Sequence, residues 1–356
     1  MSGGALRVAM AGAGWWATVA HLPALAANPR VELVAVTDTD GSRAERAAEA
    51  FGASRATNDL EDVLGDVEAV VVATPHTTHH AVASAALRAG AHVLVEKPLT
   101  TTADDAWDLV SLANAHGLVL AGGSTYQYAD TVPQIRSAVQ TQIGRLVAVN
   151  GEFSSGAGSL YAITDAEDAH LDDPGVPHGT TYSDPAQSGG GQGQAQLSHV
   201  LAAILYLAGC QATEVAAFMA DHGLPVDVVD ALTFRLEDGA LGAVTSAGTT
   251  PSGVPGRHQI RFHGTGGMVE YDMLGADAWV FTAGGGARHL AHDVSSPSYP
   301  REGPVNGFVA TVLDGAPNRA PGDLAAAAAS LTDAAYRSAR IGAVVPVLKG
   351  TVGPPR

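Results

Sequence analysis

The sequence predicts an α/β protein of two domains, and three observations support this prediction. Its 356 residues are too many for one small core and suit about two domains. Over the first third of the chain, short apolar runs alternate with amphipathic helical patterns, as in a parallel sheet covered on both faces. Beyond residue 123, apolar and polar residues alternate with a period of two, which is typical of antiparallel strands.

The first domain is expected over residues 1–122 as a doubly wound parallel sheet. Its apolar runs are bounded by glycine, proline and acidic residues, which are ordinary turn and helix-end signals. The expected strands are 6–14, 31–38, 67–75, 91–98 and 118–124, and the expected helices are 15–29, 41–52, 79–90 and 102–117.

A glycine-rich turn between the first strand and first helix predicts dinucleotide binding. Residues 12–17 read Gly-Ala-Gly-Trp-Trp-Ala and match G-x-G-x-x-G/A. Gly12 permits the tight turn, Gly14 lets the backbone approach a pyrophosphate, and Ala17 allows close helix packing. Asp38 ends the second strand, where a carboxylate accepts hydrogen bonds from the adenosine ribose and repels a 2′-phosphate. NAD is therefore expected, and the nearby Arg43 keeps NADP possible.

The second domain is expected over residues 123–356. Five segments show strand alternation with turn signals between them: 145–154, 227–236, 240–250, 257–264 and 267–273. The alanine-rich segment at about 321–341 predicts a long helix that ends at glycine.

The segment "SDPAQSGGGQGQAQLSHVLAAI" (183–204) places three consecutive glycines before a single histidine. Glycines adopt backbone conformations that other residues avoid, and they let a chain pass close to a substrate or nicotinamide. A helix from about Gln194 would carry His199 toward a cleft, with apolar residues packing behind it.

Composition excludes several classes of function. The formal net charge of -17 argues against an extended nucleic-acid surface or an anionic membrane partner. The single cysteine, Cys210, forms neither an internal disulfide nor a cysteine metal cluster. The amino-terminal residues lack a signal-peptide pattern, and no apolar run is long enough to span a bilayer, so a cytoplasmic protein is expected.

Five segments, in this order along the chain, resemble the Gfo/Idh/MocA oxidoreductase family: 21–25 (HLPAL), 73–106 (which contains VEKPL), 183–199, 262–272 and 334–347. The resemblance spans nearly the whole chain. It implies an N-terminal Rossmann domain and a C-terminal α+β domain with a large open, mostly antiparallel sheet. It also implies that the helix at about 321–341 packs back on the first domain, and that the open sheet supports a homo-oligomer, a dimer or tetramer.

Glu96-Lys97-Pro98 follows a strand directly, which places Lys97 at the carboxyl end of the sheet, where doubly wound folds bind ligands. There a lysine can assist deprotonation of a hydroxyl. The resemblance implies that Lys97 is catalytic, that His199 assists proton transfer, and that Thr74, Pro75 and His79 line the cleft. The family pattern usually has an aspartate four residues before the histidine, and here that position is Ala195.

The remaining candidate site residues are weaker. Residues 165–182 read as an acidic, solvated loop near the substrate mouth, and His170, Asp172, Asp173 and His178 lack rigid metal-ligand spacing, so no metal is expected. The predicted cofactor-binding residues are Gly12, Ala13, Gly14, Trp15, Trp16, Asp38, Thr74, Pro75, His79, Glu96 and Lys97. The predicted substrate contacts are Lys97, Tyr126, Gln127, Tyr161, Tyr182, Gln192, Gln196 and His199.

The expected function is NAD(P)-dependent hydride transfer at a hydroxyl-bearing carbon of a sugar, polyol, inositol or glycoside. One alternative is a redox-neutral enzyme that oxidises a sugar transiently while it cleaves or epimerises it. A second alternative is a non-catalytic, nucleotide-sensing regulator. The sequence leaves open which glutamine, Gln192 or Gln196, stands in for the absent aspartate.

Overall fold

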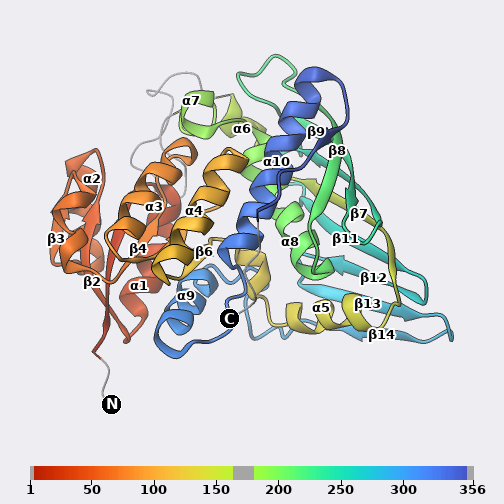
Figure 1. Ribbon diagram of the computed structural model, residues 1–356, viewed down its shortest axis with the longest axis horizontal. Coiled ribbons are helices and arrows are strands. Elements are labelled where there is room, and N and C mark those ends of the chain that lie inside the picture. Colours follow the sequence, from red (N-terminus) through yellow and green to blue (C-terminus); the bar gives the residue numbers. More distant parts are fainter. Residues whose placement is uncertain (1–3, 163–179, 351–356) are drawn as a thin grey trace.

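The computed structural model describes residues 4–162 and 180–350, and it builds them around two sheets that lie side by side (Figure 1). The first sheet has six strands in the order β3-β2-β1-β4-β5-β6, and all of its neighbouring pairs are parallel. Its strands are β1 (Leu6–Ala11), β2 (Val31–Thr37), β3 (Arg55–Thr57), β4 (Ala69–Val72), β5 (His92–Val95) and β6 (Leu120–Gly122). This is the doubly wound Rossmann arrangement, and it confirms the predicted fold class.

Helices cover both faces of this sheet because alternate strand residues point to opposite sides. Val8 and Met10 of β1 pack with one set of helices, whereas Ala9 and Ala11 pack with the other. The first set is α1 (Leu22–Ala27), α2 (Gly41–Phe51) and α9 (Gly303–Asp314), and the second includes α3 (His79–Arg88) and α4 (Ala103–His116). Helix α9 comes from the far end of the chain, so the C-terminal third helps to cover the nucleotide sheet.

The second sheet has nine strands in the order β14-β13-β12-β11-β7-β10-β9-β8-β15. Its pairs are antiparallel except for β7 with β10. The strands are β7 (Leu146–Ser154), β8 (Ala212–Ala220), β9 (Val229–Leu236), β10 (Leu241–Ala247), β11 (Arg257–Gly264), β12 (Gly267–Asp272), β13 (Asp277–Thr282), β14 (Ala287–Leu290) and β15 (Val345–Pro346). The expectation of a large, mostly antiparallel sheet is confirmed.

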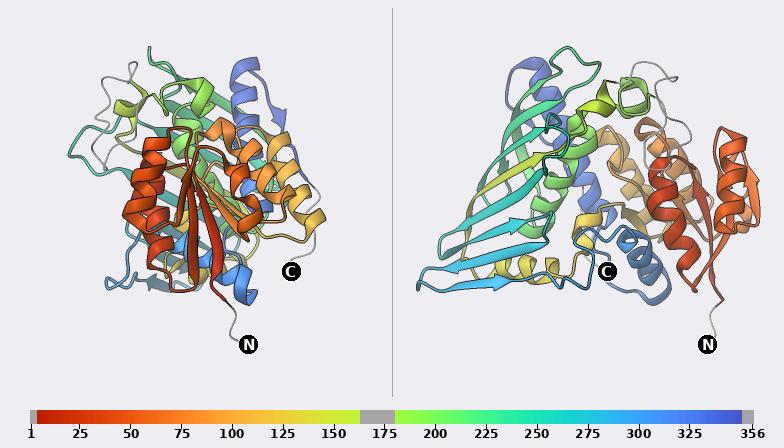
Figure 2. Two further views of the ribbon diagram at one scale, coloured as in Figure 1. Left: turned by 90° about the vertical axis from the view of Figure 1, so that its left-hand side faces the viewer. Right: turned by 180° about the vertical axis from the view of Figure 1, so that it is seen from behind.

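Only one face of this sheet carries helices in the described part of the chain (Figure 2). Helices α5 (Val132–Thr141), α8 (Ser198–Ala208) and α10 (Gly322–Ile341) pack on the inner face. Strand register places Phe218, Leu241 and Trp279 together on the other face, where Phe218 is 82% exposed. The sheet is therefore open on its outer side.

Helix α10 lies between the two sheets (Figure 1). It packs on α4 and β6 of the first domain and on α8 and β8 of the second. Trp107 of α4 donates its indole N–H to the Ser330 hydroxyl of α10 at 2.9 Å, and the Gly122 N–H donates to the Ala320 carbonyl at 2.8 Å. The contacts to α4 and β6 are those that packing back on the first domain requires.

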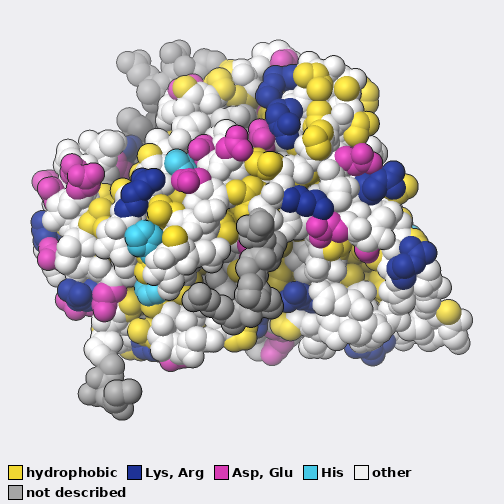
Figure 3. Space-filling model, in the orientation of Figure 1, with side chains coloured by type: hydrophobic (Ala, Val, Ile, Leu, Met, Phe, Trp, Pro, Cys, Tyr) yellow, Lys and Arg dark blue, Asp and Glu magenta, His cyan; other side chains and the backbone are white. Residues whose placement is uncertain are grey.

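Two surface properties complete the description. Acidic and basic side chains are interspersed over the face seen in Figure 3, and no continuous basic patch is visible on it. Across the described ranges, every helix is too short or too polar to cross a membrane.

Candidate active site

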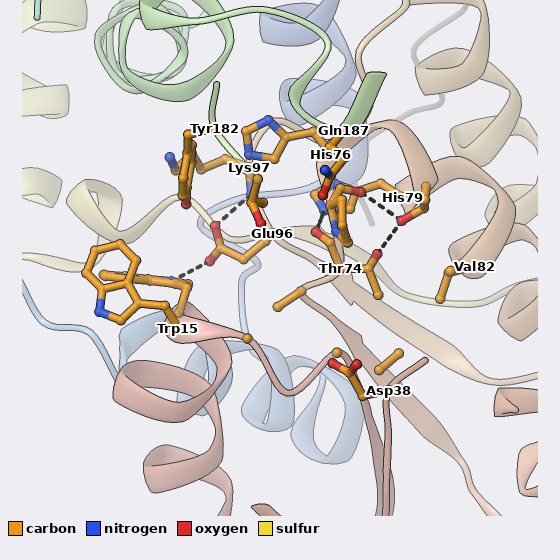
Figure 4. A pocket seen from close by; sticks show the side chains of 18 of the residues that line it. Trp15, Asp38, Thr74, His76, His79, Val82, Glu96, Lys97, Tyr182 and Gln187 are labelled. Carbon is orange, nitrogen blue, oxygen red and sulfur yellow. Dashed lines mark hydrogen bonds between the residues drawn. The ribbon is translucent and has the colours of Figure 1, made fainter. Parts of the chain in front are cut away.

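A cavity of about 1010 Å³ lies where the carboxyl ends of the parallel strands meet the second domain. Residues that end or directly follow β1, β2, β4 and β5 line its floor, which is the usual ligand edge of such a sheet. Figure 4 shows Asp38 at one end, Tyr182 at the other, and Lys97 between them on the side nearer Tyr182. We call these the nucleotide end and the substrate end. The substrate end is lined by Tyr126, Phe153, Leu160, Tyr182, Gln187, Gln196, His199, His258, Tyr299 and Arg301.

The glycine turn at the nucleotide end has the shape that a dinucleotide requires. Gly12 has φ of +96°, and a Cβ there would collide with the Ala73 carbonyl oxygen. A Cβ on Gly14 would meet open space, so the backbone beside it is free to receive a phosphate. Trp15 and Trp16 also line the cavity, whereas Ala17 is buried under the turn. These residues fit NAD.

Asp38 closes the nucleotide end. Its carboxylate accepts the Ala13 N–H at 2.8 Å and the Arg43 guanidinium at 2.8 Å, and its side chain is 8% exposed. Ala13 is buried and does not line the cavity, and its N–H orients Asp38.

Glu96 ties the glycine turn to the Glu-Lys-Pro motif. Its carboxylate accepts the indole N–H of Trp16 at 2.9 Å and the backbone N–H of Lys97 at 2.9 Å, and it lies 2.9 Å from His21 Nε2. Although burial acts in the opposite direction, the hydrogen bond from His21 holds the pKa of Glu96 below its ordinary value. Glu96 therefore stays ionised and orders both segments.

Lys97 stands between the two ends of the cavity. Its Nζ donates to the Ala195 carbonyl oxygen at 2.6 Å, and its peptide bond to Pro98 is cis. Burial lowers the pKa of Lys97 from its ordinary value, although the negative charge of Glu96 acts to raise it. A lysine with a lowered pKa is suited to exchange a proton near neutral pH.

His199 lines the substrate end beside Lys97. It is the second residue of α8. Its ring stacks on Phe153 with the centroids 5.7 Å apart and meets the Tyr126 ring edge-on at 5.4 Å between centroids. Burial first, and then the charge of Lys97, hold its pKa well below the ordinary value. His199 is accordingly neutral and able to accept a hydrogen bond.

An aromatic wall faces Lys97 and His199. Phe153 of β7 stacks on His258 of β11 with centroids 3.6 Å apart, and the Tyr126 hydroxyl lies 2.7 Å from His258 Nδ1. Tyr299 meets Tyr126 edge-on at 4.7 Å. The sequence predicts Tyr126 as a substrate contact but not Phe153, His258 or Tyr299. The predicted strands contain the first two, but nothing local distinguishes them from ordinary strand residues.

The residues after β4 form the third side of the cavity. Thr74, Pro75 and His79 line it as the resemblance implies, and so does His76, which was not anticipated. His79 lies 2.8 Å from the Pro98 carbonyl and 2.9 Å from the Thr74 carbonyl, so its ring joins these two segments. His76 Nδ1 lies 3.0 Å from the Ser188 carbonyl, and burial lowers its pKa to about 3.

The glycine run does not serve the purpose expected from the sequence. Cβ atoms added to these glycines would strike protein groups and not an open cavity: Gly189 faces Thr101, Gly190 faces Tyr336, and Gly191 faces the Asp227 backbone. The glycines therefore allow close packing within the second domain and against the first, and the predicted close approach to substrate or nicotinamide is corrected.

Three predicted substrate contacts lie away from the cavity. Gln192 is fully buried, accepts from the Tyr161 hydroxyl and donates to the Ser246 hydroxyl, and does not line the cavity. Gln127 is buried and likewise outside the lining, and Tyr161 is buried beside Gln192. Gln196 and Tyr182 do line the substrate end. Of the acidic loop 165–182, residues 165–179, with His170, Asp172, Asp173 and His178, lie outside the described residues.

Comparison with known families identifies the class that this fold and cavity define. Residues 6–124 match the oxidoreductase family with an NAD-binding Rossmann fold, and residues 134–270 match the GFO/IDH/MocA C-terminal domain. The chain belongs to the Gfo/Idh/MocA oxidoreductase family, and its first domain is an NAD-binding domain.

Individual relatives are sugar oxidoreductases by name. The chain is 38% identical over 153 residues to dTDP-3,4-didehydro-2,6-dideoxy-alpha-D-glucose 3-reductase of Streptomyces violaceoruber (42% of this chain, 44% of the relative). It is 31% identical over 216 residues to D-glucoside 3-dehydrogenase of Escherichia coli K12 (60% and 57%). The match thus spans about half the length of these relatives. The crystal structure of GenD2 from gentamicin A biosynthesis in complex with NAD has a TM-score of 0.77 and 27% identity, with 97% of each chain covered.

Proposed function

We propose that this protein is an NAD-dependent oxidoreductase that moves a hydride between the nicotinamide and a hydroxyl-bearing ring carbon of a sugar, polyol or glycoside. The observation that carries the proposal is the place of Lys97: a half-buried amine between the glycine turn of the nucleotide end and the aromatic wall of the substrate end. NAD, when bound, supplies the hydride acceptor. The protein's own residues supply position and proton transfer.

The residues suited to hold the cofactor are those of the nucleotide end. Gly12 and Gly14, with the start of the following helix, would hold the pyrophosphate. Asp38 would accept hydrogen bonds from the ribose hydroxyls. Arg43, which pairs with Asp38, is the group that would meet a 2′-phosphate. We infer a preference for NAD because the Asp38 carboxylate would lie against that phosphate.

The proton of the reacting hydroxyl is assigned to Lys97, with His199 assisting. The lowered pKa of Lys97 favours its neutral form, and the neutral His199 beside it offers a second acceptor. Ala195 supplies no carboxylate, so its backbone carbonyl is what holds the Lys97 amine in place. Gln196 contributes hydrogen bonds but no base.

The sugar is assigned to the substrate end because that region offers aromatic faces and hydroxyl-bonding groups together. Rings of Tyr126, Phe153 and Tyr299 suit the apolar faces of a pyranose, and Tyr182 and Gln196 suit its hydroxyls. Both curated relatives named above act at position 3 of a sugar by name. A secondary ring hydroxyl, with position 3 first, is therefore the site of reaction to test.

The decisive experiment incubates the purified protein with NAD, or separately NADP, and a panel of glycosides, free sugars and inositols. Nicotinamide absorbance and carbohydrate products are followed in the same tubes. Net NADH with an oxidised sugar supports the proposal. Altered carbohydrate without net NADH would replace it with the redox-neutral reaction, and NAD binding without any chemistry would favour the nucleotide-sensing regulator.

We also infer that the open sheet mediates a homo-oligomer. Phe218, Leu241 and Trp279 share its outer face, and an exposed apolar surface of this kind is typical of an interface. Light scattering of the wild type and of Phe218→Glu tests this: the variant should fall to a smaller species, and a monomeric wild type would contradict the inference. A cytoplasmic location stays a prediction.

A further inference from the structure

A half-buried carboxylate, Asp227, lies beneath the helix that carries Ala195 and His199. Asp227 Oδ1 accepts the Gly191 N–H at 2.8 Å, and Oδ2 accepts the Gly193 N–H at 2.7 Å. These N–H groups stand at the start of the π-helical turn Gly193–Leu197, which continues into α8. Because helix N-termini have unpaired N–H groups and a positive dipole end, Asp227 fixes the origin of this helix.

The surroundings of Asp227 are built to keep it in place. The Tyr336 hydroxyl of α10 donates to Asp227 Oδ1 at 2.7 Å and accepts the Gln194 N–H at 3.2 Å. Cβ atoms on Gly190 and Gly193 would strike the Tyr336 ring or hydroxyl, so the glycines are what allow this approach. Three segments distant in the sequence thus converge on one carboxylate.

A second acid, Asp230, lies against the first. It is 1% exposed, and no donor group among the described residues bonds to either of its oxygens. Burial and the Asp227 charge raise the pKa of Asp230 to about 9, so near neutral pH it carries a proton and bonds to Asp227. Tyr161 of α6 (Gly158–Tyr161) and Tyr336 are the titratable groups that face the pair, and both stay neutral because burial raises their pKa values.

The anchored turn leads directly to Lys97. The Ala195 N–H donates to the Gly191 carbonyl at 2.9 Å, and the Ala195 carbonyl accepts the Lys97 amine at 2.6 Å. Lys97 comes from the first domain, so this carbonyl is the point at which the second domain holds it. Displacing the turn would move the acceptor away from the amine.

We propose that Asp227 is the positioning residue for Lys97, acting through the glycine turn and the Ala195 carbonyl. Asp227 does not line the cavity, so it acts without touching substrate or cofactor. Only the expected effect of Asp227 on turnover rests on the function proposed above. The placement of the amine can be measured independently.

The test uses the titration of the lysine side chains, because the sequence has two lysines, Lys97 and Lys349. Full-length protein labelled with [ε-¹³C]lysine gives one side-chain signal for each, and Lys349, exposed and paired with Glu237, is an internal reference. In Asp227→Asn one of the two helix N–H groups loses its acceptor, so the carbonyl hold on Lys97 weakens. Since that hold favours the charged amine, the Lys97 pKa should fall by about one further unit. The acid limb of kcat/KM for sugar oxidation should move to lower pH by the same amount.

Asp184→Asn is the matched control. Asp184 caps the neighbouring short helix α7 (Pro185–Ser188) through the Ala186 N–H at 2.9 Å and has no contact with Lys97. The Lys97 titration should be unchanged in this variant. A folded Asp227→Asn protein whose Lys97 titrates as in the wild type would overturn the proposal and leave Asp227 as a helix cap only.

A second variant covers the case in which Asp227→Asn does not fold. Tyr336→Phe removes one donor to Asp227 and the acceptor for Gln194 N–H, and should shift the Lys97 titration in the same direction by a smaller amount. The absence of any shift there would count against the proposal. A shifted Lys97 in a protein that oxidises no sugar would refute the proposed function and leave this inference standing.

Discussion

The two ends of the cavity are built in different ways. The nucleotide end comes from residues that directly follow parallel strands, and its ligand-facing groups are mostly backbone atoms of a glycine turn and one carboxylate. The substrate end is assembled from side chains of separate segments, among them Tyr126, Phe153, His199, His258 and Tyr299. The first is a property of a local motif, whereas the second exists only once the chain has folded. Substitutions that affect one end and spare the other test this difference.

The largest effect is expected at the junction of the two ends. Lys97→Met keeps the length of the side chain and removes the amine, so sugar oxidation should fall by roughly 10²–10⁴-fold. The Kd for NAD, measured by fluorescence titration, should stay within about twofold of the wild type. Turnover that survives in Lys97→Met would show that His199 carries the proton transfer alone.

The nucleotide end should separate binding from folding. In Gly14→Ala the new Cβ has open space, so the melting temperature should hold while the Kd for NAD rises about tenfold or more. In Gly12→Ala the positive φ and the Ala73 carbonyl should cost about 1–3 kcal/mol of folding free energy. Calorimetry with and without NAD measures both. An equal loss of stability in the two variants would contradict the distinction.

The substrate end should respond in KM and not in NAD affinity. Tyr126→Phe removes the hydroxyl that holds the His258 ring at the substrate end, and we expect roughly a 2–10-fold rise in KM for the sugar. Steady-state kinetics at saturating NAD measure this rise. A changed Kd for NAD in this variant would mean that the two ends are coupled.

A separate effect concerns acid stability. Burial lowers the pKa of His258 to about 4 from an ordinary value near 6.5. The unfolded chain therefore binds the extra proton first, and the stability that the neutral ring contributes is present above pH 6.5 and lost as the pH falls toward 4. His258→Gln should reduce this loss by up to about 1.4 kcal/mol per pH unit across that window. Urea unfolding of both proteins at pH 7 and pH 5 measures it, and parallel pH dependences would contradict the assignment.

The same division explains which features the sequence predicts. The nine alternating elements of the first domain and the turn at Gly12 follow from local patterns, and each has its counterpart in the structure. Helix α9 was not anticipated, because Gly303, Pro304 and Gly307 are poor helix formers. Cβ atoms at Gly303 and Gly307 would strike the Tyr128 ring, so the packing that requires these glycines lies outside the helix itself.

The candidate site shows more clearly what local sequence patterns cannot predict. His258 lies in a correctly predicted strand, yet its partner Tyr126 is 132 positions away, and only the fold brings them together. Asp227 was read as the first residue of a strand, and its bonds to Gly191 and Gly193 have no sequence pattern. Gln192 and Gln196 could not be told apart until helical geometry turned one inward and the other toward the cavity.

Helix α10 has a consequence for the order in which the protein is made. The first domain's sheet and α4 are covered in part by residues 320–341, through Trp107 with Ser330 and Gly122 with Ala320. During synthesis, residues 4–122 emerge long before that helix, and at ordinary elongation rates they wait roughly 10–40 s for it. Leu120 and Trp107 are without their C-terminal cover during that interval. The NAD-binding domain is therefore not completed until helix α10 has been translated.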